Sequence, residues 1–299
     1  MFFILDKYVI FRTVIECGSL TRAAVRLHLT QSGVSHALAS LEAELGLPLL
    51  LRGRSGIILT DCGRQLLPFI QEILQTQEQL QQAVASFKGL DAGIVSIGTF
   101  TSVSSHWLPE IIKNFKQAHP QIEIKLAEGD YDEIKQWILE GHVDFGFLSL
   151  RTAKDLETIP LHQDNFLCLL PPSHPLKRQK KIALRQLQAE PFILPKWGPH
   201  DDVRHMLKEA RIVPEIKYEV TEEKAIIAMV ENGLGISILP EMALAGLQHS
   251  LRLIELEDCL CRTISLCFRP SYIAPPAVAA FLAQLARRFP KAVFPIHSH

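Results

Sequence analysis

Long apolar runs are absent from the sequence. No stretch of about 18 apolar residues occurs in the 299-residue chain, so we expect neither a membrane span nor a membrane partner. The first residues, MFFILDKYVIFRTV, lack a basic leader and a small-residue cleavage site, which argues against a secretory signal. An apolar content of 47% is typical of globular proteins, and the length suits two or three domains. The cytoplasm is the expected compartment.

Sequence signatures of enzymes are also lacking. The chain has no phosphate-binding loop, no dinucleotide-binding glycine pattern, no zinc-protease motif and no complete serine nucleophile motif. His200, Asp201 and His205 are the best candidates for a metal site, but acidic residues in the first turn of a helix more often complement the helix dipole. We therefore expect no catalytic residues, no metal and no cofactor.

Cysteines are few, and they do not form a pattern. The six lie at positions 17, 62, 168, 259, 261 and 267, with no second pair at zinc-binding spacing. Scattered cysteines suit a reducing compartment, where free thiols are commonly buried. Buried, reduced thiols are the favoured interpretation, and a redox sensor is the alternative.

Basic charge is not in excess. The net charge is −1, and the first 64 residues contain seven Lys/Arg against five Asp/Glu. Binding to nucleic acid without sequence preference depends on many contacts between Lys or Arg and phosphates. A nucleoid-type protein is therefore disfavoured, and the placement of particular side chains has to decide whether the chain binds DNA.

The first 45 residues predict three helices in quick succession. Apolar residues recur at helical spacing from Ile4 to Ile15, and Gly18 is a natural end for this helix. Ser19 is placed to cap a short helix in SLTRAAVRL, and Thr30 is placed to cap the next one. Two helices joined by a short turn indicate a helix-turn-helix, whose second helix enters the DNA major groove by its N-terminal end.

The third helix, within LTQSGVSHALASLEAELG, begins with small and polar residues. Small side chains allow close approach to a duplex, and hydroxyl and amide groups can bond to base edges or phosphates. The side chains predicted to contact DNA from this helix are Thr30, Gln31, Ser32, Ser35 and His36. A capped surface helix without a DNA partner is the alternative.

The segment after this helix favours DNA binding. Two apolar runs, 48–51 and 56–59, flank RGRSG and predict a β-hairpin. Arg52 and Arg54 lie at its tip without an acidic neighbour, in the position of a wing that contacts phosphates or the minor groove. A solvated pair of charges is the simpler alternative.

A long helix is predicted from Thr60 to about Lys88, with apolar positions separated by steps of four and three. This spacing is typical of a coiled-coil seam, in which Gln77 fills one position. The predicted dimerisation residues are Leu66, Ile70, Ile73, Leu80, Val84 and Phe87. A core-facing amphipathic helix is the alternative, but the glutamine-rich opposite face favours pairing with a copy of itself.

Beyond KGLDAG, strand and helix patterns alternate. The expected strands are 93–99, 121–127, 143–148, 164–170, 191–194, 215–219, 234–238 and 262–268. The expected helices are 104–118, 130–140, 200–210, 221–231 and 275–288. Such alternation predicts parallel sheets covered by helices, and about two hundred residues suit two small α/β lobes.

The segment GSLTRAAVRLHLTQSGVSHALASLEAELGLPLLLRGRSGIILTDCG resembles the winged helix-turn-helix of LysR-type transcriptional regulators, and the helix after it resembles their dimerising linker. The family often has arginine at the position of His36 and proline at that of Ser32. The resemblance implies a homodimer or dimer of dimers on double-stranded operator DNA, with RNA polymerase as a further partner. It also implies a C-terminal effector domain of two α/β lobes, similar to periplasmic solute-binding proteins.

The resemblance implies three parts of the chain. These are a DNA-binding domain (1–59), a linker helix (60–90) and an effector-binding domain (91–299). The chain is expected to cross between lobes near Leu161–Gln163 and to return near Cys267–Pro270. Lobe I would then comprise 91–162 and 269–299, and lobe II 163–268. An enzyme or solute-binding module joined to a DNA-binding head is the rival hypothesis.

Ligands of open α/β sheets bind beyond the carboxyl ends of strands. Three segments occupy such positions: TFTSVSS, rich in hydroxyls; Ser149; and WGPHD, which contains Trp197. Matching segments line the inducer cleft in the family, and the predicted effector-binding residues are Phe100, Thr101, Ser102, Ser149 and His200. The hydroxyls and nearby backbone N–H groups favour a small organic anion as inducer, although Asp201 would repel an anion or select an amine.

Overall fold

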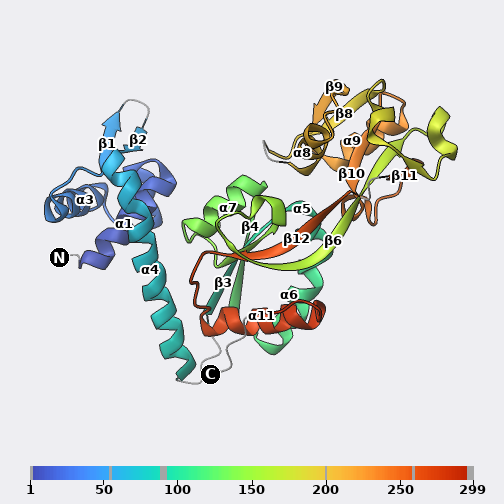
Figure 1. Ribbon diagram of the computed structural model, residues 1–299. Coiled ribbons are helices and arrows are strands. Elements are labelled where there is room, and N and C mark those ends of the chain that lie inside the picture. Colours follow the sequence, from blue (N-terminus) through green and yellow to red (C-terminus); the bar gives the residue numbers. More distant parts are fainter. Residues whose placement is uncertain (1–2, 54–55, 88–92, 199–200, 258–259, 295–299) are drawn as a thin grey trace. The chain divides into compact units, whose positions relative to one another are not determined.

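The computed structural model describes residues 3–53, 56–87, 93–198, 201–257 and 260–294 (Figure 1). They form two compact units, one of residues 1–90 with 140–142, and one of residues 91–139 with 143–299. No helix in the described residues is both long and apolar enough to cross a membrane.

The first unit begins with three helices, α1 (Ile4–Cys17), α2 (Leu20–Arg26) and α3 (Gln31–Leu45). Gly18 ends α1 with a positive φ of 61°, and the Ser19 hydroxyl accepts a bond from Arg22 N at the start of α2. The helices enclose one apolar core, in which Phe11, Val14 and Leu41 are fully buried. Each helix is too short to be stable alone, so their mutual packing stabilises the arrangement.

A two-stranded antiparallel hairpin follows, with β1 (Leu50–Gly53) paired to β2 (Gly56–Leu59). The Glu42 carboxylate of α3 accepts bonds from Leu49 N at 2.7 Å and Leu50 N at 3.0 Å, and this fixes the entry into the hairpin. The predicted helix-turn-helix and hairpin are therefore present.

The helix α4 (Asp61–Phe87) starts against the hairpin. The Thr60 hydroxyl donates to Pro48 O and accepts from Gly63 N at 2.9 Å, so one side chain caps the helix and holds the preceding loop. A Cβ at Gly63 would lie 2.2 Å from Leu49 O, a distance at which the backbone has to move. Glycine is required at this position because the loop passes directly over the helix.

The second unit contains two lobes joined by two long strands, β6 (Glu157–Leu170) and β12 (Cys261–Phe268) (Figure 1). In the first lobe the strand order is β4-β3-β5-β12-β6, with β4 (Ile122–Glu128), β3 (Gly93–Thr99) and β5 (Phe145–Ser149) mutually parallel. β12 is antiparallel to both β5 and β6, so the expectation of parallel sheets holds for only part of this sheet.

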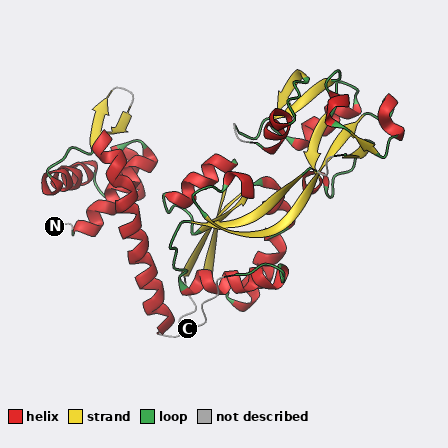
Figure 2. Ribbon diagram, in the orientation of Figure 1, coloured by secondary structure: helices red, strands yellow, loops and turns green. Residues whose placement is uncertain are grey.

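Helices cover the first-lobe sheet, as Figure 2 shows. These helices are α5 (Thr101–His106), α6 (Leu108–Ala118), α7 (Tyr131–Leu139) and α11 (Pro276–Arg288). The expected single helix 104–118 is divided at Trp107, and α6 then restarts with Pro109 in its first turn, where the missing N–H of proline costs no helical bond.

The second lobe is built on the far half of β6. That half pairs with β10 (Ser237–Pro240) and β11 (Arg252–Leu256), and β11 also pairs with β7 (Lys181–Ile182). A separate parallel pair consists of β8 (Pro191–Pro195) and β9 (Glu215–Val220). The helices are α8 (Asp202–Glu209), α9 (Glu223–Glu231) and α10 (Glu241–Leu244), with 3-10 turns at Pro175–Arg178 and Leu184–Leu187, while the 3-10 turn Leu150–Thr152 follows β5 in the first lobe. The short elements β7, β11 and α10 were not predicted.

The chain returns between lobes earlier than predicted. Leu260 packs against the core of the second lobe, whereas Ile264, Leu266 and Phe268 belong to the core of the first. The return therefore lies near 260–262, not at 267–270, and residues 261–268 are part of the first lobe. The return thus coincides with the start of β12.

Candidate DNA-binding surface and effector cleft

The front of α3 is a polar surface. Thr30, Gln31, Ser32 and His36 are exposed, and Ser35 is half-buried. The Thr30 hydroxyl accepts from Gly33 N at 3.1 Å and lies 3.1 Å from the Ser32 hydroxyl, so Thr30 serves as the N-cap of the helix. On the opposite side of the helix, Val34, Leu38 and Leu41 are buried. The five residues predicted to contact DNA therefore share one accessible end of the helix, and their role in base recognition stays a prediction.

The two predicted wing arginines are only partly within the described structure. Arg52 pairs with Ile57 in the hairpin, but its side chain is not described. Arg54 lies outside the described residues, in the two-residue connection between β1 and β2.

The predicted seam of α4 is divided between two roles. Ile70 is buried in the core of its own unit, which corrects its assignment to dimerisation, and Leu66 is partly buried against the same core. Ile73, Leu80 and Val84 remain 41%, 64% and 43% exposed, and Phe69 is also exposed. The Phe87 side chain is not described. An apolar stripe thus remains uncovered along the helix beyond Ile70.

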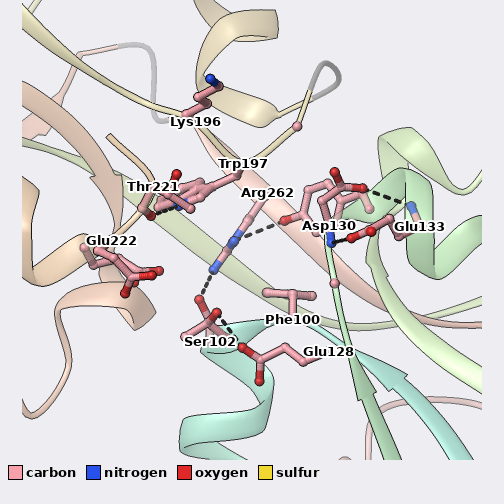
Figure 3. A pocket seen from close by; sticks show the side chains of 15 residues that line it. Phe100, Ser102, Glu128, Asp130, Glu133, Lys196, Trp197, Thr221, Glu222 and Arg262 are labelled. Atoms are coloured by element: carbon pink, nitrogen blue, oxygen red, sulfur yellow. Dashed lines mark hydrogen bonds between the residues drawn. The ribbon is translucent and has the colours of Figure 1, made fainter. Parts of the chain in front are cut away.

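A cleft of about 380 Å³ lies between the lobes of the second unit (Figure 3). The first lobe contributes the end of β3, the start of α5 and the segment that joins β4 to α7. The second lobe contributes the ends of β8 and β9, and Arg262 lies on β12 at the crossing. The lining residues are Phe100, Thr101, Ser102, Glu128, Gly129, Asp130, Tyr131, Glu133, Lys196, Trp197, Gly198, Thr221, Glu222, Glu223 and Arg262.

Arg262 is the centre of the hydrogen-bond network at the bottom of this cleft. Its Nε and Nη2 donate to one Asp164 oxygen at 2.9 and 2.8 Å, and Nη2 also donates to the Ser102 hydroxyl at 2.9 Å. Its Nη1 donates to the Tyr131 hydroxyl at 3.1 Å, and the guanidinium lies over the Phe100 ring at 5.0 Å. Side-chain exposure is only 4% for Arg262 and 1% for Asp164, so this ion pair is fully buried.

Asp202, at the start of α8, connects the second lobe to the first. Its carboxylate accepts from the Ser149 hydroxyl at 2.9 Å, the Tyr131 hydroxyl at 3.1 Å and the Arg151 guanidinium at 3.2 Å. Burial raises the pKa of Tyr131 above its ordinary value, so the hydroxyl stays protonated and can donate to Asp202. Three donors of the first lobe therefore hold one carboxylate of the second.

The predicted effector residues have different positions. Phe100, Thr101 and Ser102 line the cleft, as predicted from the hydroxyl-rich segment after β3. Ser149 is buried and bonded to Asp202, and the described lining does not include it. This corrects its assignment as a direct ligand contact. His200 lies outside the described residues.

Several lining residues were missed by sequence reasoning. Glu128 follows β4 and Tyr131 starts α7, so both lie beyond the carboxyl end of a predicted strand, where a ligand is expected. Their position after a strand end could therefore have predicted that both residues line the cleft. Arg262 could not be found in this way, because it lies at the first half of its strand.

The lining is acidic. Glu128, Asp130, Glu133, Glu222 and Glu223 face two basic residues, one of which is paired with Asp164. Burial raises the pKa of Glu223 most, and Glu222 and Glu128 raise it further, while a backbone hydrogen bond and the Arg262 charge lower it in part. This charge distribution does not favour the anion that was expected from the sequence.

Asp201 is not among the described residues that line the cleft, although the sequence placed it nearby. It caps α8 by accepting from Arg204 N at 2.8 Å, and it is 1% exposed. Burial raises its pKa, while the Arg204 backbone and charge lower it. Asp201 therefore stabilises the helix that presents Asp202.

The described thiols follow the favoured interpretation in part. Cys168 and Cys267 are buried, and burial raises the pKa of each to about 12, which keeps these thiols protonated. Cys17 and Cys62 are half-buried, and Cys261 is exposed, so the expectation of burial is wrong for Cys261. Cys259 lies outside the described residues.

Asp202→Asn is expected to lower the free energy of unfolding by about 1–3 kcal/mol, because hydrogen bonds from Ser149, Tyr131 and Arg151 lose a charged acceptor. Urea unfolding followed by tryptophan fluorescence measures this effect, since all three tryptophans, 107, 137 and 197, lie in the second unit. The matched control is Glu209→Gln in the same helix, where an exposed pair with His205 contributes little. Equal stability of the two variants would contradict the bridging role of Asp202.

A helix-turn-helix unit joined to a two-lobed unit with a cleft of metabolite size defines a class of protein, the ligand-responsive DNA-binding regulators. Residues 5–64 match the family described as bacterial regulatory helix-turn-helix protein, lysR family, and residues 88–290 match the LysR substrate binding domain. The chain belongs to the LysR family of transcriptional regulators.

Individual relatives match over most of the chain. The HTH-type transcriptional regulator YvbU of Bacillus subtilis is 36% identical over 80% of this chain and 82% of its own. The probable regulator LrrA of Synechococcus elongatus is 34% identical over 94% and 96%. Among solved structures, full-length OxyR from Pseudomonas aeruginosa has a TM-score of 0.76 at 23% identity, covering 96% of this chain and 95% of that one. The protein is thus a DNA-binding transcriptional regulator whose effector domain responds to a small molecule.

Proposed function

We propose that this regulator recognises an operator with the front of α3 and its wing, and that a ligand in the cleft between the lobes changes its activity on that operator. The observation that supports DNA recognition is the accessible polar end of α3, with Gln31 and His36 exposed above a buried apolar face. RNA polymerase is the proposed further partner, in the cytoplasm, and we propose no catalytic reaction for the chain.

The active assembly is proposed to be a homodimer or a dimer of dimers, with α4 as the contact between copies. The support is the exposed apolar stripe of Ile73, Leu80 and Val84 on a helix that otherwise packs its own unit through Ile70 and Leu74. Two DNA-binding units linked in this way would bind two half-sites, and the second binding event would gain from effective concentration.

The direct test is binding of the purified full-length protein to the DNA upstream of its own gene, in competition with random DNA of equal length. Specific regulators commonly bind their site about 10³–10⁷-fold more tightly than other DNA. Equal affinity for the two DNAs would contradict operator recognition through α3.

Gln31→Ala and His36→Ala are each expected to weaken operator binding by about 1–3 kcal/mol while binding to random DNA is nearly kept, because base contacts determine specificity. Electrophoretic mobility shifts on both DNAs measure the two effects. Gln121→Ala, an exposed glutamine of the second unit, is the matched control and should change neither.

The wing arginines should show the opposite behaviour. Arg52→Ala and Arg54→Ala are expected to weaken binding to all DNA and to reduce the salt dependence by about one unit for each phosphate that is no longer neutralised. A loss confined to the operator would indicate base recognition by the wing and would contradict this assignment.

A further inference from the structure

The strongest anion-binding donors near the cleft already bind carboxylates of the protein itself. Ser149, Tyr131 and Arg151 all donate to Asp202, and Arg262 donates two bonds to Asp164. An anionic ligand that used these donors would have to displace one of these internal carboxylates. Of the hydroxyls that suggest an anion from the sequence, those of Thr101, Ser104 and Ser149 already donate to carboxylates of the protein.

The remaining charges of the lining are mainly negative. Once Arg262 is paired with Asp164, the described lining residues present five carboxylates and one ammonium, that of Lys196, to the cleft. In Figure 3 the Lys196 ammonium points away from Arg262 and Glu222. Lys196 also helps to lower the pKa of Glu219, after the larger effect of the hydrogen bond and charge of Arg204. Lys196 therefore also interacts with Glu219, a residue outside the lining.

The carboxylates come from both lobes. Glu128 accepts hydroxyl bonds from Thr101 at 3.0 Å and Ser104 at 2.7 Å, which hold it in place but do not neutralise it. Glu222 and Glu223 lie across the cleft at the start of α9. Among the residues that the structure describes, no lysine or arginine forms an ion pair with Glu128, Glu222 or Glu223. A cation between the lobes would reduce the repulsion among these groups.

An aromatic wall accompanies the acidic residues. The Trp197 indole N–H donates to Thr221 O at 2.9 Å, which fixes the ring beside the cleft. The Phe100 ring is already occupied, with Arg262 over it and Tyr131 against it at 5.2 Å. Trp197 is therefore the aromatic side chain that can receive a ligand, and a tryptophan face attracts an ammonium as well as apolar groups.

We propose that the cleft binds a small organic cation with at least one ammonium group, held between Glu128 of the first lobe and Glu222 and Glu223 of the second, with its carbon chain against Trp197. This inference rests on the proposed function, since it names the ligand class of the same cleft. A ligand that meets carboxylates of both lobes would hold the lobes together, as the hydrogen bonds of Asp202 do.

The proposal requires a pH dependence of a definite sign. The raised pKa of Glu223 means that this carboxyl takes up a proton at a higher pH than an ordinary glutamate, and the proton competes with a cation. Cation affinity is therefore expected to fall as the pH is lowered from about 7 to about 5, a range in which aliphatic amines keep their charge. Glu223→Gln should flatten this dependence.

The test uses probes of matched length and different charge on the full-length protein. They are 1,4-diaminobutane, succinate, 1,4-butanediol and, as a divalent cation without a carbon chain, magnesium chloride. Titration calorimetry and tryptophan fluorescence measure binding, and Trp197 reports directly from the cleft.

Saturable binding is expected for the diamine alone. Glu128→Gln and Glu222→Gln should each raise its dissociation constant about tenfold, on the order expected for one lost charged bond. Glu110→Gln on α6, outside the lining, should not.

Three results would overturn the assignment: saturable binding of succinate, binding of magnesium without the diamine, or no diamine binding up to about 10 mM, where even a weak specific site is occupied. Diamine binding that both glutamine variants leave unchanged would overturn the location in the cleft. Operator binding by the same preparation is measured separately. A protein that binds its operator but responds to succinate keeps the proposed function and loses the ligand class, whereas loss of operator recognition contradicts the function itself.

Discussion

Asp164→Ala is expected to lower the free energy of unfolding of the effector unit by about 3–5 kcal/mol, because it leaves the buried Arg262 charge without its counterion. The remaining acceptors for Arg262 are two neutral hydroxyls, those of Ser102 and Tyr131. The substitution also removes the acceptor of Met242 N, which bonds to the second Asp164 oxygen at 3.0 Å. Two polar groups would therefore be left unsatisfied in the region where the lobes join.

Tryptophan fluorescence during urea unfolding measures this loss in the full-length chain, because the first unit contains no tryptophan. Glu255→Ala is the matched control, since it breaks a mainly exposed pair with Lys181 at 3.4 Å and should cost less than about 1 kcal/mol. The double variant Asp164→Leu with Arg262→Met should recover much of the stability, because apolar residues of similar volume often replace a buried ion pair without loss. Equal stability of Asp164→Ala and the control would show that the buried pair contributes no more than a surface pair.

Local features of the fold were predictable from the sequence because their causes lie within a few residues. Ser19 and Thr30 cap α2 and α3 as predicted, each by accepting a backbone N–H three residues ahead. The hairpin and the strand β3 were also placed within a residue or two, since turn residues and apolar runs mark their ends. The positions of Thr101 and Ser102 in the cleft were predictable because both residues directly follow the end of β3.

The charge of the effector cleft was not predictable, because it depends on contacts between distant parts of the chain. Arg262 meets Asp164, Tyr131 and Ser102 across 98, 131 and 160 residues. The sequence shows Ser149 only as a hydroxyl at a strand end. It does not indicate that this hydroxyl donates a hydrogen bond to Asp202. A donor that is already satisfied by the fold is indistinguishable in sequence from one that awaits a ligand.

The helix α4 shows a different limit. Its apolar positions follow one regular spacing, but Ile70 packs into its own unit and Leu80 is exposed. A heptad pattern states which residues share a helix face and does not state what covers that face. Only the position of the helix against α1 and the hairpin divides the stripe into an internal part and an external part.

Leu80→Asp is expected to disrupt the dimer and to reduce operator binding with it. Leu80 is 64% exposed on the described helix, so the aspartate is tolerated in the isolated protomer but has to be desolvated in the proposed seam. A cost of about 3 kcal/mol would raise the dimer dissociation constant about a hundredfold.

Sedimentation velocity measures the dissociation constant, and mobility shifts measure operator binding, which should fall about 10²–10⁴-fold when the two DNA-binding units are no longer linked. Leu80→Met is the matched control, because it keeps an apolar side chain of similar volume and should preserve both properties. Ile70→Ala should behave differently from Leu80→Asp. It opens a cavity in the core of the first unit and should lower its thermal stability, because Ile70 is buried there. A Leu80→Asp protein that remains dimeric and binds its operator with unchanged affinity would show that copies of this regulator associate through another surface.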